Sequence, residues 1–373
     1  MDCGLFVMKV PFSYLSEQFA DPDPILRDIK KVVKRGDFTL GAEVGRFEAQ
    51  FAKVCGTKYA VGVNSGTDAL FLSLKALGIG QGDEVITMTS TFIATAGAIA
   101  ASGAKPVFVD CNEEYVIDPD LAEKAVTPRT KAIMPVHYAG HPADMPRILG
   151  IARRHDLHVV EDACQGISSA IDGKVCGSFG EAAGFSLHPL KNINVWSDAG
   201  IITTNSEEIC GKLRLLRNHG MKNRDEYEFF GYNSRLDTVQ AAVGLHIIKQ
   251  LEKITRKKIE HAGMYDKALS GLPEVTIPPR RKNVRYVYHL YIVQVADRDG
   301  LLRYLNGNGI EAKVHYPVPL HLQNCSKHLG YRTGDFPVAE EQAKNIITLP
   351  AHQHLSDKQI QFVIEKIRKF YGK

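Results

Sequence analysis

A lysine and an aspartate stand out because their types and positions could carry chemistry. Lys191 closes the run Ser186–Lys191, and Asp162 follows the apolar, strand-like segment Leu157–Val160. An amine of this kind can hold an aldehyde carbon as an imine, and a carboxylate can keep a pyridine nitrogen protonated so that the ring accepts electrons. The pair therefore predicts a site for pyridoxal 5'-phosphate.

Each of these two residues also has a plainer interpretation. Asp162 could cap a helix or form a structural ion pair, and Lys191 could be a surface lysine, as most lysines are. Open α/β sheets bind ligands at the carboxyl ends of their strands, which favours the functional interpretation of Asp162. Apolar Phe185 and Leu187 before the lysine, and Trp196 after it, indicate a partly buried turn. Burial there would lower the lysine pKa, which an imine-forming amine needs.

A candidate phosphate site follows the first strand-like segment. Ser65 can cap a helix that begins there, with Asp68 three residues on as its capping-box partner. The unpaired amides of that first turn, with Gly66 and Thr67, would bind an anion. Ser186 could supply another phosphate contact. The alternative is an ordinary capped helix.

Two further residues could contact the ring of the same cofactor. Phe92 follows the second strand-like segment and could cover one ring face, although aromatic residues in such positions more often pack in a core. Gln165, three residues past Asp162, could reach the phenolic oxygen, or it could be a polar loop residue.

Between residue 59 and about residue 205, short β-rich runs alternate with helical ones. This alternation predicts an α/β fold with a mostly parallel sheet sandwiched by helices. The run 200–204 follows 185–187 at short separation, so we expect an antiparallel strand there. The expected strands are 59–63, 84–88, 106–110, 131–135 and 157–160, and the expected helices are 67–77, 93–102, 120–126 and 144–155.

A second α+β segment follows a long helical region from Asp237 to about Leu269. Helical spacing of its apolar residues supports that region. Further on, we expect a strand at Val287–Val295 and a terminal helix at Ser356–Tyr371. The organisation predicted is a large domain, 1–250, and a smaller C-terminal domain, 251–373.

Composition limits the classes of partner. The 46 Lys and Arg residues nearly balance 42 Asp and Glu residues, so we expect no nucleic-acid partner, and the basic run Arg256–Lys258 is interpreted as a solvated helix face. Seven scattered cysteines and the histidine spacings predict no metal site and favour a reducing compartment. The apolar stretch Phe92–Ala104 is too short to span a membrane, and Met1–Met8 lacks the features of a signal peptide. A cytoplasmic protein is expected.

With those residues in view, the chain resembles the pyridoxal-phosphate sugar aminotransferases of the DegT/StrS type. The resemblance covers nearly the whole chain. Each motif is weak alone, but the ordered set is specific. The matching segments are Phe38–Val44, Ser65–Leu70, Thr91–Thr95, His137–Asp144, Glu161–Gln165, Ser186–Lys191, Asn233–Asp237 and His315–Pro317.

The resemblance implies a fold of the aspartate-aminotransferase type (fold type I) and a homodimer with active sites at the interface. It implies that Lys191 is the imine-forming lysine and Asp162 the partner of the pyridine nitrogen. It also implies contacts for the remaining candidates. By resemblance, the phosphate would be held by Gly66, Thr67, Ser186 and the partner subunit's Asn233, the ring by Phe92 and Gln165, and the substrates by Arg235, His315 and Tyr316.

The function implied by the resemblance is transfer of an amino group from L-glutamate to a keto-sugar, most simply a nucleotide-linked 3-keto or 4-keto deoxysugar. Lys191 would move the α-proton, first as a base and then as an acid. A related dehydratase branch has histidine in place of this lysine, so Lys191 favours transamination. Two alternatives stay open. The acceptor could be a keto-cyclitol or free keto-sugar, or the protein could be a non-catalytic, cofactor-binding regulator.

Overall fold

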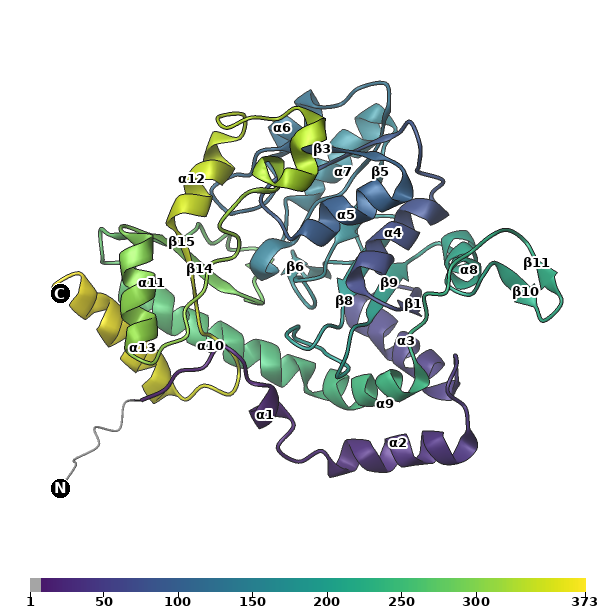
Figure 1. The fold of residues 1–373 in the computed structure, drawn as a ribbon, viewed down its shortest axis with the longest axis horizontal. Helices are drawn as coiled ribbons and strands as arrows, with labels where there is room; N and C mark the ends of the chain where they lie inside the picture. The colour runs from purple at the N-terminus through teal and green to yellow at the C-terminus, as the bar shows by residue number, and fades with distance from the viewer. Residues whose placement is uncertain (1–7) are drawn as a thin grey trace.

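The computed structural model describes residues 8–373 and is built around a seven-stranded sheet (Figure 1). The order across the sheet is β1-β9-β8-β5-β4-β2-β3. Only β9 runs antiparallel to its neighbours, which confirms the predicted mostly parallel sheet and the antiparallel strand at 200–204. The strands are β1 (Tyr59–Val63), β2 (Glu84–Met88), β3 (Lys105–Val109), β4 (Thr130–Ile133), β5 (His158–Asp162), β8 (Ala182–Ser186) and β9 (Gly200–Thr204).

Helices cover both faces of this sheet because the strands present apolar side chains on both faces. Val85 of β2 packs with α4 and α5 on one face, whereas the next residue, Ile86, packs with α7 on the other. The same division holds for β1, where Val61 faces α8 and Ala60 faces α3 and α9. The helices are α3 (Ala42–Cys55), α4 (Gly66–Ala76), α5 (Ile93–Ser102), α6 (Pro119–Lys124), α7 (Met145–His155), α8 (Glu207–Leu216) and α9 (Thr238–Ile247).

A second, three-stranded antiparallel sheet lies in the C-terminal third, in the order β12-β14-β15. The long helix α10 and helices α11 and α13 bury their apolar stripes against it. The terminal helix was predicted correctly, and Ser356 caps it. The domain boundary near residue 250 stays a prediction. The elements are α10 (Leu251–Leu269), β12 (Val275–Thr276), β14 (Tyr291–Val295), α11 (Arg298–Gly307), α12 (Pro337–Asn345), β15 (Ile346–Leu349) and α13 (Asp357–Phe370).

Shorter elements decorate this framework. A hairpin formed by β10 and β11 projects away from the body of the molecule (Figure 1). The N-terminal helix α2 lies alongside α9. The remaining elements are α1 (Leu15–Gln18), α2 (Asp23–Arg35), β6 (Ala170–Ile171), β7 (Lys174–Val175), β10 (Met221–Asn223), β11 (Glu226–Tyr227), β13 (Val284–Arg285) and the 3-10 turns 138–140, 248–250, 320–322 and 324–329.

Two sequence predictions about secondary structure need correction. The strand predicted for Val287–Val295 begins only at Tyr291, because the preceding segment pairs with the turn at 138–140 instead: the amides of Val287 and Leu290 donate to Gly140 and Ala139. The helical region after Asp237 is interrupted by a 3-10 turn at 248–250. The residues Met1–Val7, on which the signal-peptide prediction largely rests, lie outside the described part of the chain.

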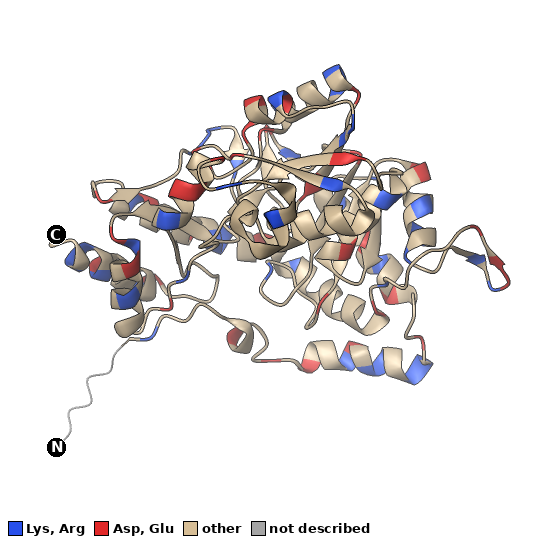
Figure 2. Cartoon of the chain, turned by 45° about the horizontal axis from the view of Figure 1, so that its top comes forward, with Lys and Arg blue, Asp and Glu red and all other residues tan. Residues whose placement is uncertain are grey.

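The charged side chains are mixed over the surface rather than collected in one place. Figure 2 shows basic and acidic residues interspersed along the helices, in keeping with the formal net charge of +4. None of the helices within residues 8–373 is long and apolar enough to cross a bilayer.

Candidate active site

The carboxyl ends of four parallel strands converge on one cavity of about 490 Å³. Strand β1 leads into Gly66, β2 into Phe92, β5 into Asp162, and β8 into the loop that carries Lys191. Parallel strands place their carboxyl ends at one edge of the sheet, so residues far apart in sequence meet there. The predicted residues that line this cavity are Gly66, Thr67, Phe92, Asp162, Gln165, Ser186, Lys191, His315 and Tyr316.

Lys191 lies on the loop between β8 and β9, which is fixed at several points. Its amide donates to the carbonyl of His188 at 2.8 Å, and its own carbonyl accepts from the Tyr14 hydroxyl at 3.3 Å. The amide of Leu187 donates to the carbonyl of Ala199 at 2.8 Å, which closes the loop. Burial lowers the pKa of the Lys191 ammonium, against the opposing influence of Cys164 and Asp162. More of the amine is therefore available as a nucleophile and base.

Asp162 ends β5 and is 4% exposed. One carboxylate oxygen accepts the Thr95 hydroxyl at 2.7 Å, and the other accepts the Cys164 amide at 3.2 Å. The Thr95 hydroxyl is 3.0 Å from that of Thr91, which extends the network. The groups that donate to this carboxylate in the described chain, a hydroxyl and an amide, carry no positive charge. A buried charge needs a partner, and a protonated pyridine nitrogen would provide one.

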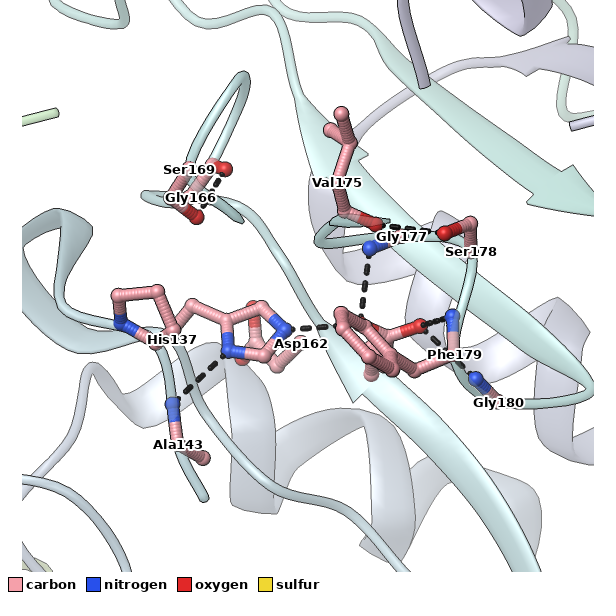
Figure 3. A network of polar contacts seen from close by, with 12 residues as sticks. His137, Ala143, Asp162, Gly166, Ser169, Val175, Gly177, Ser178, Phe179 and Gly180 are labelled. Carbon is pink, nitrogen blue, oxygen red and sulfur yellow. Dashed lines mark hydrogen bonds and ion pairs between the residues drawn. The ribbon is translucent and has the colours of Figure 1, made fainter. Parts of the chain in front are cut away.

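The neighbouring residue, Glu161, faces the side of the strand opposite to Asp162, as the alternation of side chains along a strand requires, and fastens a loop. Figure 3 shows the loop residues Gly177, Phe179 and Gly180 that take part in this network. The two carboxylate oxygens of Glu161 accept the amides of Gly177, Phe179 and Gly180 at 2.8–2.9 Å. The ring of His137 also lies 2.9 Å from Glu161. With Cys176 these residues have the composition of a metal site, but a carboxylate already filled by three amides serves to hold the loop behind Asp162.

The phosphate site was predicted at the start of α4, and its shape fits an anion. Ser65 caps the helix by accepting the Asp68 amide at 3.0 Å. A Cβ at Gly66 would come within 2.7 Å of the Ser186 Cβ, so only glycine leaves this space open beside the first-turn amides. The predicted capping box is wrong: the carboxylate of Asp68 accepts the Ser234 hydroxyl at 2.6 Å, not the backbone of Ser65.

Phe92 and Gln165 line the same cavity as Lys191 and Asp162. Phe92 is 50% exposed, which makes core packing the wrong alternative, and its ring centroid is 5.8 Å from that of Tyr316. The side-chain oxygen of Gln165 accepts the Ala139 amide at 2.7 Å. That bond leaves the amide nitrogen as the donating end of the side chain, which is directed toward the phenol group of Tyr316.

His315 and Tyr316 form part of the opposite wall. The Tyr138 hydroxyl donates to the carbonyl of His315, and the His315 ring lies 2.9 Å from the Thr348 hydroxyl. Burial and the charges of Lys313 and Lys191 lower the pKa of His315 to about 4. The imidazole is therefore neutral near pH 7 and can exchange hydrogen bonds with a polar substrate without adding charge.

Asn233 and Arg235 do not line the cavity of their own chain. Asn233 is exposed and pairs with Asn218 near the base of the β10–β11 hairpin, and the Arg235 guanidinium donates to the Asn218 side chain at 3.0 Å. Their roles, like those of the other site residues, stay predictions.

The cavity-lining residues that the sequence analysis missed include Tyr14, Lys258 and His289. The solvated face predicted for Arg256–Lys258 is wrong for its last member, since Lys258 is 3% exposed while Arg256 is exposed. The apolar stripe of α10 contained the signal, because Ile254, Lys258 and Ala262 recur at intervals of one helical turn. Tyr14 and His289 carry no comparable sequence pattern.

Comparison with known proteins agrees with this geometry. A protein of Geobacillus stearothermophilus called "pleiotropic regulatory protein" is 43% identical and covers 98% of this chain and 99% of its own length. The dTDP-3-amino-3,4,6-trideoxy-alpha-D-glucose transaminase of Streptomyces venezuelae is 41% identical, and the match covers 92% of this chain and 90% of that protein. The crystal structure of S. venezuelae DesV in complex with a ketimine intermediate superposes with a TM-score of 0.95, at 40% identity, covering 98% of this chain and 99% of that one.

The family and the cofactor follow from these matches and from the site. Solved structures of the same fold include forms with bound pyridoxamine phosphate and with pyridoxal phosphate. The cavity has the lysine, the buried carboxylate and the glycine-lined anion site that this cofactor requires. The profile of the DegT/DnrJ/EryC1/StrS aminotransferase family matches residues 21–368. The chain belongs to this family of pyridoxal-phosphate-dependent sugar aminotransferases.

Proposed function

We propose that this chain transfers the amino group of L-glutamate to a nucleotide-linked keto-sugar, with a 3-keto deoxysugar as the first acceptor to test. The observation that carries the proposal is the meeting of Lys191 and Asp162 in one cavity beside the anion site at Gly66. The relative from S. venezuelae, named for a dTDP-3-amino sugar, supports the class of acceptor.

The side chains divide the work. Bound pyridoxal phosphate supplies a carbonyl carbon that bonds to amines and a ring that draws electrons from the adjoining carbon. Asp162, oriented by Thr95, holds the positive charge of the ring nitrogen. The Nζ of Lys191, whose pKa burial lowers, takes the proton from the donor's α-carbon as a base and returns it as an acid. The same residues act in reverse order on the sugar.

We further propose a homodimer in which Asn233 and Arg235 complete the partner subunit's site, at its phosphate and substrate ends respectively. The exposed aromatic residues of the projecting hairpin segment, Tyr227 at 57% and Phe230 fully exposed, support an interface there. Mixing Lys191→Ala subunits with Asn233→Ala subunits tests this. Shared sites would restore activity to the mixture by creating an intact site, whereas sites within single chains would leave both mutants inactive.

The reaction itself is tested by incubating the purified protein and cofactor with glutamate and a panel of acceptors: dTDP-linked 3-keto and 4-keto sugars, free keto-sugars and keto-inositols. Release of 2-oxoglutarate with a nucleotide-linked sugar is expected. Borohydride reduction should fix the cofactor covalently on Lys191, and fixation at any other residue would contradict the assignment.

The same assay distinguishes two alternative functions. Selective use of keto-inositols would show a cyclitol aminotransferase. The name of the Geobacillus relative favours a regulator, and a protein that binds cofactor but releases no 2-oxoglutarate with any acceptor would support that role.

We also propose a cytoplasmic location, supported by the free state of all six described cysteines.

A further inference from the structure

Lys258 is a buried cation that the mechanism above does not use. It occupies the apolar stripe of α10, and 3% of its surface is exposed. Its ammonium meets the carbonyl oxygens of Tyr288 and His289, each at 3.4 Å. Burial is the sole cause that lowers its pKa, to about 8, so no carboxylate among the described residues offsets the cost. An ammonium has three N–H donors, so two long contacts leave its hydrogen bonding incomplete.

The same ammonium lies on the wall of the cavity that contains Lys191. Tyr14 links the two lysines: its hydroxyl donates to the Lys191 carbonyl at 3.3 Å, and its ring centroid is 5.9 Å from the Lys258 nitrogen. His289 lines the same cavity as both lysines, and burial, followed by their charges, holds its pKa well below the usual range. A small molecule that reacts beside Lys191 therefore shares the cavity, of about 490 Å³, with Lys258.

Lys191 and Lys258 are the lysines that line this cavity, and no arginine among the described residues lines it. His315 and His352, which also line the cavity, each have a pKa lowered to about 4, chiefly by burial. The Nδ1 atom of His289 is buried and has no hydrogen-bond partner in the described chain, so it too is available to a ligand. The anion site at Gly66 lies at the start of α4, on a separate element.

We propose that Lys258 binds a carboxylate of the amino-acid donor. This inference rests on the proposed function, which supplies the donor, and it names the residue that selects it. A carboxylate would give the ammonium the short, charge-assisted bond that two carbonyls at 3.4 Å do not. The group concerned is the side-chain carboxylate, which glutamate has and neutral amino acids lack, so this lysine favours glutamate over neutral amino acids.

The test compares Lys258→Met, Lys258→Arg and the matched control Lys253→Met, which makes the same change at an exposed position of α10. Two readouts are needed. The first is calorimetric binding of glutarate, a dicarboxylate without an amino group, to each protein. The second is the two half-reactions measured separately in single turnovers, with glutamate in one and the amino-sugar product in the other.

Lys258→Met should weaken glutarate binding and raise the half-saturating glutamate concentration by roughly 10- to 100-fold, the loss expected for a hydrogen bond to a charged group. The amino-sugar half-reaction should change by less than about threefold on the same reasoning. Lys258→Arg should recover part of the affinity, and Lys253→Met should match the wild type.

Equal losses in both half-reactions would overturn the inference, since they indicate a structural role, and so would a loss confined to the amino-sugar half-reaction. The proposed function fails separately. If the wild type transfers no amino group but binds glutarate through Lys258, the carboxylate site stands without the reaction.

Discussion

The buried charge of Lys258 predicts an unusual stability profile for Lys258→Met. The pKa of this lysine falls from 10.5 to about 8 in the folded protein. Each pKa unit corresponds to about 1.4 kcal/mol, so the protonated ammonium lowers the free energy of unfolding by roughly 3 kcal/mol below pH 8. Because the unfolded chain binds more protons between the two pKa values, stability rises with pH across that window, and the penalty is gone above the higher value.

Methionine removes this penalty but leaves the carbonyls of Tyr288 and His289 without a donor. Two long hydrogen bonds contribute about 1–2 kcal/mol together. We therefore expect Lys258→Met to be more stable than the wild type by about 1–2 kcal/mol near pH 7 and no more stable near pH 10. Urea unfolding of the cofactor-free protein across this pH range measures the difference, with Lys253→Met as control.

A difference in stability that does not change with pH would refute this reasoning, because the gain depends on titration of one group. A variant less stable than the wild type near neutral pH would also refute it. Stabilisation combined with loss of donor affinity would show a lysine kept for function at the expense of stability.

Other predictions concern the cofactor site. Asp162→Asn should lower the single-turnover rate by roughly 100-fold or more, since it removes the charge opposite the ring nitrogen; a rate near that of the wild type would contradict that role. Thr95→Val removes the hydroxyl 2.7 Å from Asp162 and should lower the same rate about tenfold, with unchanged cofactor affinity as the check that the fold persists. Gly66→Ala should weaken cofactor binding at least about tenfold in a fluorescence titration, because its Cβ would lie 2.7 Å from that of Ser186. Gly97→Ala, with open space around its Cβ, should keep the affinity and gain about 0.5–1 kcal/mol of stability; equal affinities in the two glycine variants would refute the steric argument.

The sequence predicted the sheet and the strand-end residues well because both follow from local patterns. Alternating β-rich and helical runs determine a parallel sheet, and a parallel sheet brings Gly66, Phe92 and Asp162 to one edge whatever their separation. The chain from Val287 to Leu290 was different. Its apolar, β-branched and aromatic composition suits a strand, but the turn at 138–140 takes its amides, and no local pattern reveals a partner so far away.

Lys258 shows a second limit of prediction from the sequence. Charge alone suggested a solvated residue, and the helical spacing that places it among buried neighbours conflicts with its type. Such conflicts between residue type and pattern mark functional positions, because a buried charge without a carboxylate partner costs stability that packing alone would not justify. Asn233 and Arg235 do not line the cavity of their own chain, so the roles proposed for them, which need a second subunit, stay predictions.

The close backbone contact between Gly200 and Ser65 fixes the position of the lysine loop relative to the anion site. A Cβ at Gly200 would come within 2.1 Å of the Ser65 carbonyl oxygen, so the point where the lysine loop re-enters the sheet is pressed against the start of α4. The segment that follows the lysine loop and the segment that carries the anion site at Gly66 are therefore positioned by the same backbone contact, which extends the pairing of β9 with β1. A larger residue at Gly200 would therefore displace the end of the lysine loop and the start of the anion site together.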